Sequence, residues 1–243
     1  MPHRARVLSE SGFYHVVPKG IADQIIFLSD EDRYAYLTHL AQAKRDYGLL
    51  IHAYCLMSNH VHLAVQDPKR NLSEALKYVH ESYPRHYANK IGRTGGVFRK
   101  PYWSEPIEDG KRLACAVRYI HNNPFAAGIC SVSEYEWSSV KDYLGLRKGD
   151  LTYTSTILDM AGGVKGFVEF SRASSATAVP FEGSRLRAHL GDDEAYRLAE
   201  GILGHKPNIG ATVDTAHILK SRGFSQKQIM RITGLGKNQV IKA

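Results

Sequence analysis

Cysteine is scarce in this sequence. Only Cys55, Cys115 and Cys130 occur among 243 residues, and no two of them form a C-x-x-C pair. An odd number of scattered cysteines argues against a disulfide framework and against a zinc site ligated by cysteine. We interpret all three as reduced, mostly buried thiols of a cytoplasmic protein.

Long apolar runs are also missing. No run approaches the roughly 18–20 residues that a membrane-spanning helix needs, and the opening Met1–Arg6 lacks the apolar core of a signal peptide. Acidic residues are outnumbered, with 24 Asp and Glu against 32 Lys and Arg, a net charge of +8 and a pI of about 9.3. We therefore expect no membrane, a polyanionic partner with nucleic acid first, and a nucleoid-associated location.

The first 148 residues alternate strand-like and helix-like patterns. The predicted strands cover 13–17, 49–56, 60–66 and a short edge strand at 97–99. The predicted helices run from a Ser29 or Asp30 cap to Gly48, from an Asn71 or Ser73 cap to 91, and from 109 to 123, where Pro124 stops the last one. This order predicts an α+β domain over 1–148, with a ferredoxin-like antiparallel sheet and helices on one face.

The remaining residues differ in character. Residues 149–190 are rich in Gly, Ser, Thr and Ala, which favours a partly ordered connector. Residues 191–243 have helical patterns, and the segment 225–243 has the spacing of a helix-turn-helix around Gly234-Leu235-Gly236. A DNA-binding domain would use Lys237, Asn238 and Gln239 for phosphates and base edges. A merely structural helical appendage is the alternative.

Two histidines begin the third predicted strand, in Ser58-Asn59-His60-Val61-His62-Leu63. Side chains alternate faces along a strand, so Val61 and Leu63 would enter a core while His60 and His62 share the opposite face. Two imidazoles placed in this way can ligate one divalent cation. A half-exposed pair on an edge strand is the alternative.

The helix predicted over 109–123 carries Tyr119 and Asn123, four residues apart and therefore neighbours on one face. If that face met the histidines, the Asn123 amide oxygen would complete a ligand set with open positions for a phosphate oxygen. Tyr119 could then attack phosphorus and form a covalent intermediate. Plain packing of Tyr119 in the core is the alternative.

Together these motifs resemble those of HUH-type single-tyrosine transposases. The most similar group is the REP-associated tyrosine transposases and their insertion-sequence relatives. The resemblance covers about residues 1–145 and includes the opening Met1–Arg6, Tyr14-His15-Val16, Ser58–Leu63, Tyr119–Pro124 and the following Phe125–Gly128. It implies that His60 and His62 are metal ligands, Asn123 the third ligand and Tyr119 the nucleophile. His121 is a possible substitute ligand, although it lies on a different helix face.

The resemblance also implies a reaction. With Mg²⁺ or Mn²⁺, Tyr119 would attack single-stranded DNA beside a hairpin, giving a 5′-phosphotyrosine and a free 3′-OH that can rejoin strands. Such proteins include monomers and homodimers. A non-catalytic DNA-binding regulator that kept the fold, and a hydrolase that uses water, are the alternatives.

The second predicted helix and the turn before it carry a basic face that would suit DNA binding. Its candidate DNA-binding residues are Lys69, Arg70, Lys77 and Arg85, with Tyr78, Tyr83 and Tyr87 among them for base stacking. A solvated amphipathic helix whose tyrosines lie in the core is the alternative. Flanking duplex DNA is a possible second partner, bound through residues 191–243.

Overall fold

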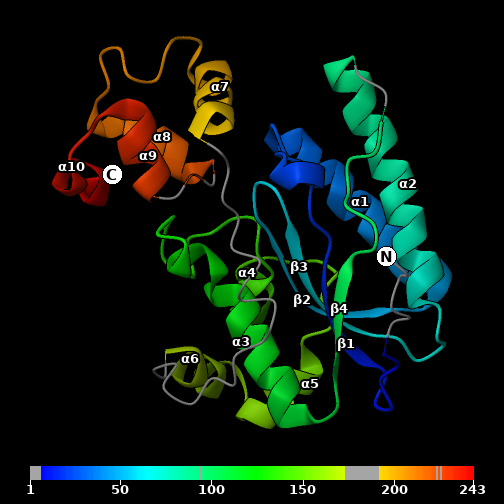
Figure 1. Ribbon diagram of the computed structural model, residues 1–243. Helices are drawn as coiled ribbons and strands as arrows, with labels where there is room; N and C mark the ends of the chain where they lie inside the picture. The colour runs from blue at the N-terminus through cyan, green and yellow to red at the C-terminus, as the bar shows by residue number, and fades with distance from the viewer. Residues whose placement is uncertain (1–6, 93–94, 173–191, 223, 225) are drawn as a thin grey trace.

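A computed structural model describes residues 7–92, 95–172, 192–222, 224 and 226–243 (Figure 1). Its first part follows the predicted order of strand, helix, strand, strand, helix and strand. The elements are β1 (Phe13–Val17), α1 (Asp30–Tyr47), β2 (Leu50–Leu56), β3 (Val61–Gln66), α2 (Leu72–Ile91), β4 (Trp103–Ile107) and α3 (Gly110–Ala126), with a short 3-10 turn at Ile21–Asp23.

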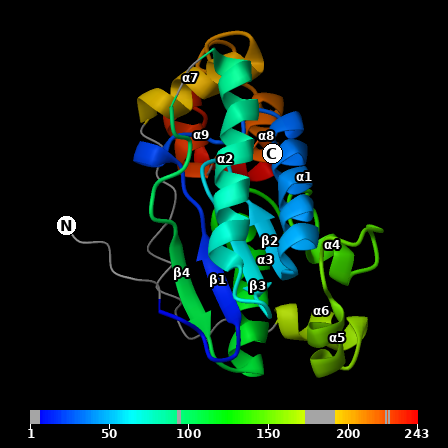
Figure 2. The ribbon, with the colours of Figure 1, turned by 90° about the vertical axis from the view of Figure 1, so that its right-hand side faces the viewer.

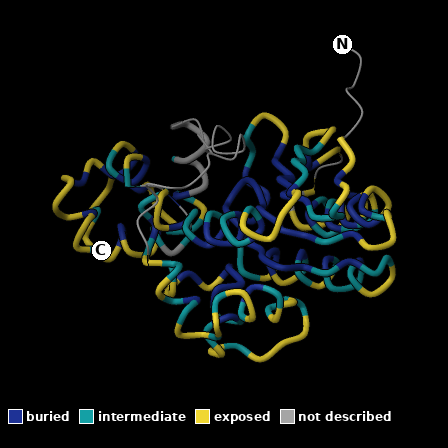
Figure 3. The backbone as a smooth tube through the Cα atoms, turned by 90° about the horizontal axis from the view of Figure 1, so that it is seen from below, coloured by how far each residue is buried: buried dark blue, intermediate teal, exposed yellow. Residues whose placement is uncertain are grey.

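The strands form one antiparallel sheet in the order β2-β3-β1-β4, which confirms the ferredoxin-like prediction. Helices α1 and α2 pack together on one face, as expected (Figure 2). Helix α3 lies on the opposite face, against β2 and β3, so the prediction of helices on one face holds for α1 and α2 but not for α3. Nearly every residue of β2 and β3 is buried, which requires a cover on both faces of the sheet. Buried residues run continuously through these layers (Figure 3).

The helix boundaries follow the capping residues in the sequence. Ser29 begins α1, where the Asp32 side chain completes a capping box, and Gly48 ends it in the left-handed region at φ 73°. Gly92 ends α2 in the same way, at φ 63°. The Asp109 carboxylate accepts a hydrogen bond of 2.7 Å from the Arg112 amide and so begins α3.

Two boundary predictions were wrong. The edge strand is β4 at Trp103–Ile107, and Phe98 makes only an isolated bridge to Gly20. An edge strand tolerates a charged residue and a proline, since one side of its backbone needs no partner, and β4 contains both Glu105 and Pro106. Helix α3 also continues past Pro124 to Ala126, because the Ala127 amide still closes the last turn on the Asn123 carbonyl at 2.9 Å.

The predicted connector is partly an ordered extension of the first domain. Helices α4 (Val140–Tyr143), α5 (Ser155–Ala161) and α6 (Val164–Arg172) follow α3. Ile157 and Phe167 are buried in the first core, and the Phe167 ring stacks on Tyr143 with centroids 4.6 Å apart. The first core therefore extends beyond residue 148. Residues 173–191 lie outside the described residues.

Four further helices build a second core: α7 (Asp192–Leu203), α8 (Val213–Ser221), α9 (Gln226–Thr233) and α10 (Lys237–Lys242). Ile229, Leu235 and Val240 are buried in it, and Met230 packs at its margin. Helix α9, the turn at 234–236 and α10 occupy the segment predicted as a helix-turn-helix. Residues 223 and 225 lie outside the described residues.

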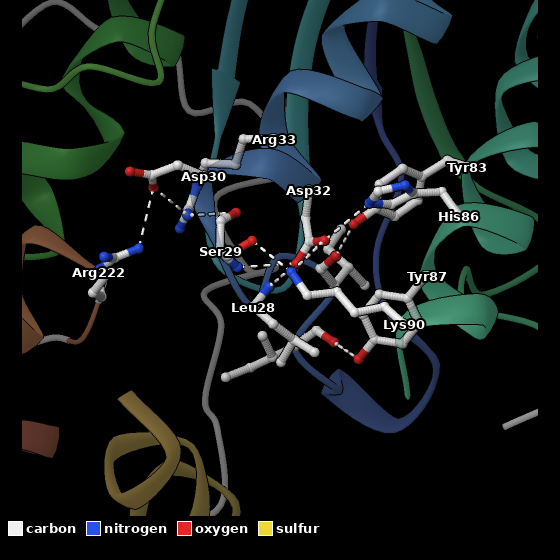
Figure 4. Close-up of polar contacts among 12 residues, drawn as sticks. Leu28, Ser29, Asp30, Asp32, Arg33, Tyr83, His86, Tyr87, Lys90 and Arg222 are labelled. Atoms are coloured by element: carbon white, nitrogen blue, oxygen red, sulfur yellow. Dashed lines mark hydrogen bonds and ion pairs between the residues drawn. The ribbon is translucent and has the colours of Figure 1, made fainter. Parts of the chain in front are cut away.

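Asp30 and Asp32 connect α1 to its neighbours (Figure 4). The fully buried Asp32 carboxylate accepts hydrogen bonds from the Leu28 and Ser29 amides and from His86 and Lys90 on α2. The more exposed Asp30 pairs with Arg222 at 3.3 Å, which joins the C-terminal helices to α1. No helix in the described part of the chain is both long and apolar enough to cross a membrane.

Candidate active site

His60 and His62 meet at their ring nitrogens. His60 is bridged to Lys19 just before β3, and His62 lies in β3 itself. The two Nε2 atoms are 3.0 Å apart, and the side chains are 3% and 2% exposed. Because β3 lies between β2 and β1, the pair is not on an edge strand and is not half-exposed.

Asn59 contacts the His60 ring at Nδ1, the ring nitrogen that does not face His62. Its Oδ1 lies 2.8 Å from His60 Nδ1, and its Nδ2 donates to the Asp23 carbonyl at 3.1 Å. The amides of Ile26 and Phe27 both donate to the Ser58 carbonyl, at 2.9 and 3.2 Å. The turn that presents the histidines is therefore fixed by side-chain and backbone bonds.

His15 is a third imidazole that the residue patterns did not assign to the site. Its Nε2 lies 3.0 Å from His62 Nδ1, and the two rings stack with centroids 5.3 Å apart. Trp103 on β4 packs edge-on against His15 with a centroid distance of 5.2 Å. Only the resemblance at Tyr14-His15-Val16 drew attention to this residue.

Tyr119 and Asn123 come to the same place from α3. The Tyr119 ring meets His62 and His15 edge-on, with centroid distances of 5.6 and 5.7 Å. Asn123 donates to the Tyr119 carbonyl at 2.8 Å, and its side chain also hydrogen-bonds His62, which raises the pKa of that imidazole. The four residues predicted for the site therefore converge within one chain.

His121 does not share this site. It lies on the buried side of α3, where its Nε2 is 2.8 Å from Ser139 Oγ and its ring packs against Tyr143 and Phe167. The possibility of His121 as a substitute ligand is therefore wrong, for the reason that its helix face indicated.

Burial keeps the three site imidazoles neutral. It lowers the pKa of His60 to about 3, with smaller contributions from the charges of Lys19 and His15. Burial also holds the pKa of His62 and of His15 well below 6.5, and each is lowered further by a neighbouring histidine. Neutral imidazole is the form that ligates metal ions.

The donor set fits a divalent cation. Two nitrogens about 2.1 Å from one ion and at right angles would be about 3.0 Å apart, and the two Nε2 atoms are separated by 3.0 Å. Among the described residues, no group of three or more His, Cys, Asp and Glu side chains is arranged to hold a metal. Asn123, whose side chain hydrogen-bonds His62, carries an amide oxygen that could join the two imidazoles in a ligand set.

The candidate DNA-binding residues lie elsewhere. Lys69 and Arg70 are exposed before α2, and Lys77 and Arg85 are exposed on it, over the sheet face opposite the histidines (Figure 2). Lys237, Asn238 and Gln239 are exposed in the first turn of α10, although Gln239 Oε1 accepts a hydrogen bond from the Gly236 amide at 2.9 Å.

The tyrosines of α2 are largely unavailable for base stacking. Tyr83 and Tyr87 are 0% and 7% exposed, and their hydroxyls donate to the Ile26 and Ile25 carbonyls. Tyr78 is half-buried. Of the two interpretations of this helix, the one with tyrosines in the core is confirmed for Tyr83 and Tyr87.

Comparison with known proteins agrees with this geometry. Residues 11–123, from β1 to α3, match the family model of IS200-like transposases. A Haemophilus influenzae protein named as a REP-associated tyrosine transposase is 26% identical over an alignment of 99 residues, which covers 36% of this chain and 56% of that relative. The match thus spans about half of the relative's length. Residues 11–123 are therefore similar to IS200-like transposases and to a relative of the REP-associated tyrosine type.

One solved structure has the same fold. A REP-associated tyrosine transposase bound to a REP hairpin matches with a TM-score of 0.51 and 20% identity, covering 64% of this chain and 96% of that one. A Deinococcus radiodurans protein described as a transposase matches with a TM-score of 0.34 and 19% identity, covering 50% of this chain and 96% of its own.

Proposed function

We propose that this protein is a metal-dependent enzyme that nicks and joins single-stranded DNA beside hairpins. The observation that carries the proposal is the contact of Tyr119 with His62, whose ring centroids are 5.6 Å apart, while His62 Nε2 lies 3.0 Å from His60 Nε2 in the same chain. The match of residues 11–123 to the family model of IS200-like transposases supports it. DNA transposition, or a host function derived from it, is the process that such an activity serves.

Tyr119 is the proposed nucleophile. Its phenol oxygen bonds to the phosphorus of a DNA phosphodiester, and the bond from phosphorus to the 3′ oxygen breaks. The phenol loses its proton and the departing oxygen gains one, so the products are a 5′-phosphotyrosine and a free 3′-OH. Attack of a 3′-OH on the phosphotyrosine reverses these changes and joins strands without water or a nucleotide.

His60, His62 and Asn123 are the proposed ligands of Mg²⁺ or Mn²⁺. When bound, the cation would supply positive charge that offsets the charge of the phosphate as Tyr119 attacks. The burial of both imidazoles keeps them unprotonated and able to ligate. Asn123 also bonds to the Tyr119 carbonyl, so one residue connects the ligand set to the turn of helix that bears the nucleophile.

Hairpin DNA is the proposed partner because the solved relative of matching fold is a complex with a REP hairpin. The net charge of +8 suits a polyanion. The described active-site residues all come from one chain, so the proposed site is complete in a monomer, and a homodimer is not required for it.

A covalent trapping experiment tests the nucleophile. Labelled hairpin DNA with Mn²⁺ should give a protein–DNA adduct on a denaturing gel, and Tyr119→Phe should abolish it. Tyr78→Phe, a half-buried tyrosine on α2, is the matched control and should retain the adduct. An adduct that survives in Tyr119→Phe would refute the assignment.

The same gel separates the alternative functions. Cut DNA with free ends and no adduct would indicate a hydrolase that uses water. Uncut DNA under every metal condition, together with tight binding of duplex DNA, would indicate a non-catalytic regulator. His60→Ala should lose cleavage more than hairpin binding; equal loss of both would count against a catalytic metal.

A further inference from the structure

Three imidazoles form one hydrogen-bonded series with Asn59. The distances are 2.8 Å from Asn59 Oδ1 to His60 Nδ1, 3.0 Å from His60 Nε2 to His62 Nε2, and 3.0 Å from His62 Nδ1 to His15 Nε2. A neutral imidazole has one N–H and one lone pair. Each contact needs one proton, so the position of the proton in any ring determines its position in the next.

Asn59 sets the direction of the series. Its Nδ2 donates to the Asp23 carbonyl, so its Oδ1 faces His60 and can only accept. His60 therefore carries its proton on Nδ1 and has a lone pair at Nε2. The 3.0 Å contact with His62 is then a hydrogen bond only if His62 is protonated at Nε2, which leaves His62 Nδ1 to accept from His15.

A cation between His60 and His62 requires the opposite arrangement at His62. Its Nε2 must then provide a lone pair, so its proton must be on Nδ1. His15 Nε2 lies 3.0 Å from that atom and can accept the proton's hydrogen bond if His15 in turn is protonated at Nδ1. The His15 Nε2 proton passes to His62 Nδ1, the His62 Nε2 proton is released as the cation takes its place, and His15 Nδ1 takes up one proton. Both rings change tautomer, and the pair holds two protons before and after, so neither ring changes charge.

We propose that His15 is a positioning residue that exchanges hydrogen-bond roles with His62 and so allows His62 to ligate a divalent cation; this inference rests on the metal of the proposed function. Partners of this kind orient metal-ligating histidines and fix their tautomers. His15 is suited to the role because it is fully buried and packs against Trp103 and Tyr119.

The chemistry of the position predicts which replacements work. Phe fills similar space but can neither donate nor accept. Lys and Arg cannot accept, and a carboxylate cannot donate while ionised. Gln can do both by turning its amide. His15→Phe should therefore disable the exchange, and His15→Gln should restore it.

Metal binding by the full-length protein, without DNA, is the direct test. Free Mn²⁺ measured by electron paramagnetic resonance should show affinity reduced roughly 10–100-fold in His15→Phe, and close to wild type in His15→Gln. His80→Phe is the control, because His80 is also buried but stacks on Phe98 away from the site. Wild-type affinity in His15→Phe would overturn the role of His15 and leave the metal intact. Wild-type protein that binds no Mn²⁺ would instead refute the metal, and the role of His15 with it.

A second measurement needs no substitution and so does not depend on the folding of a variant. Nitrogen-15 spectra of histidine-labelled wild-type protein should show the His62 proton on Nε2 without metal and on Nδ1 with Mg²⁺, with the His15 proton moving in the same direction. A His62 proton on Nδ1 in both conditions would overturn the exchange.

Discussion

Replacing Asp32 by Asn should destabilise the first domain strongly. The carboxylate is fully buried and accepts four hydrogen bonds: from the Leu28 and Ser29 amides at 2.7 and 2.9 Å, and from His86 and Lys90 at 3.1 and 3.0 Å. An asparagine turns its NH₂ group towards one of these two pairs of donors, so at least two bonds are lost. Breaking a buried charge pair costs about 3–5 kcal/mol, which lowers the melting temperature by roughly 6–20 °C in a domain of this size.

Asp30→Asn is the matched control for this prediction. Asp30 lies two residues earlier at the same helix terminus, but its side chain is 48% exposed and pairs with Arg33 and Arg222 at 3.4 and 3.3 Å. Arg222 is 36% exposed, and exposed pairs of that kind contribute about 0–1 kcal/mol. Arg33 is buried, but it also donates to the Ser29 carbonyl, and the asparagine oxygen can still accept from it. Thermal unfolding followed by circular dichroism should therefore separate the two variants clearly. Equal losses of stability would refute the idea that the hydrogen bonds of Asp32 hold α1 against α2.

The pH dependence of unfolding gives an independent check. Burial alone would raise the pKa of Asp32, but the hydrogen bonds from Lys90, His86 and the two amides outweigh it, so the pKa lies below its ordinary 3.8. A depressed pKa contributes stability that is fully present above the unfolded value and is lost as pH falls through the folded value. The wild type should therefore lose stability below about pH 3.8, and the Asp32→Asn variant should lose less stability over the same pH range.

The Asp32→Asn variant should also reduce DNA cleavage, because Asp32 fixes the Leu28 and Ser29 amides. These lie next to the residues whose amides bond the Ser58 carbonyl.

The remaining predictions concern DNA binding. Replacing Lys77 and Arg85 by Ala should lower the slope of log affinity against log salt by about 1.4–1.8 for a DNA hairpin, since each phosphate contact contributes about 0.7–0.9; an unchanged slope in fluorescence anisotropy would remove α2 from the DNA interface. Replacing Lys237 and Asn238 by Ala should weaken binding of flanking duplex in a gel-shift assay while hairpin cleavage continues. Equal loss of cleavage would contradict a separate role for α10.

The elements of the first domain were predictable where local signals, such as capping residues, agree with tertiary packing. Ser29 and Gly48 bound α1 because a capping hydroxyl and a left-handed glycine satisfy helix ends without any tertiary contact. Strand β4 was missed for the converse reason. Its Glu105 and Pro106 conflict with strand propensity, and only pairing with β1 over Phe13–Val17 makes the segment extended.

Helices α5 and α6 show a different limit. Each is short, and they are separated by Gly162 and Gly163, both in the left-handed region. Their attachment to the core depends on two buried anchors, Ile157 and Phe167, among many small and polar residues. The amino-acid composition of such a segment is dominated by its small and polar residues, so it predicts a connector. Two buried side chains are nevertheless enough to attach the segment to the core.

In the candidate site, the register between β1 and β3 brings together residues from separate sequence motifs. Alternation alone placed His60 and His62 on one face of β3, but it could not say which residues of another strand share that face. The observed register pairs His15 with Ala64, which makes His15 a diagonal neighbour of His62. That register also pairs Tyr14 with Val65 and Val16 with Leu63, so apolar residues meet on the other face. A slip by one residue would turn His15 into the apolar core. The apolar pairing of β1 and β3 therefore stabilises the sheet and, by the same register, places His15 against the metal-ligand candidate His62.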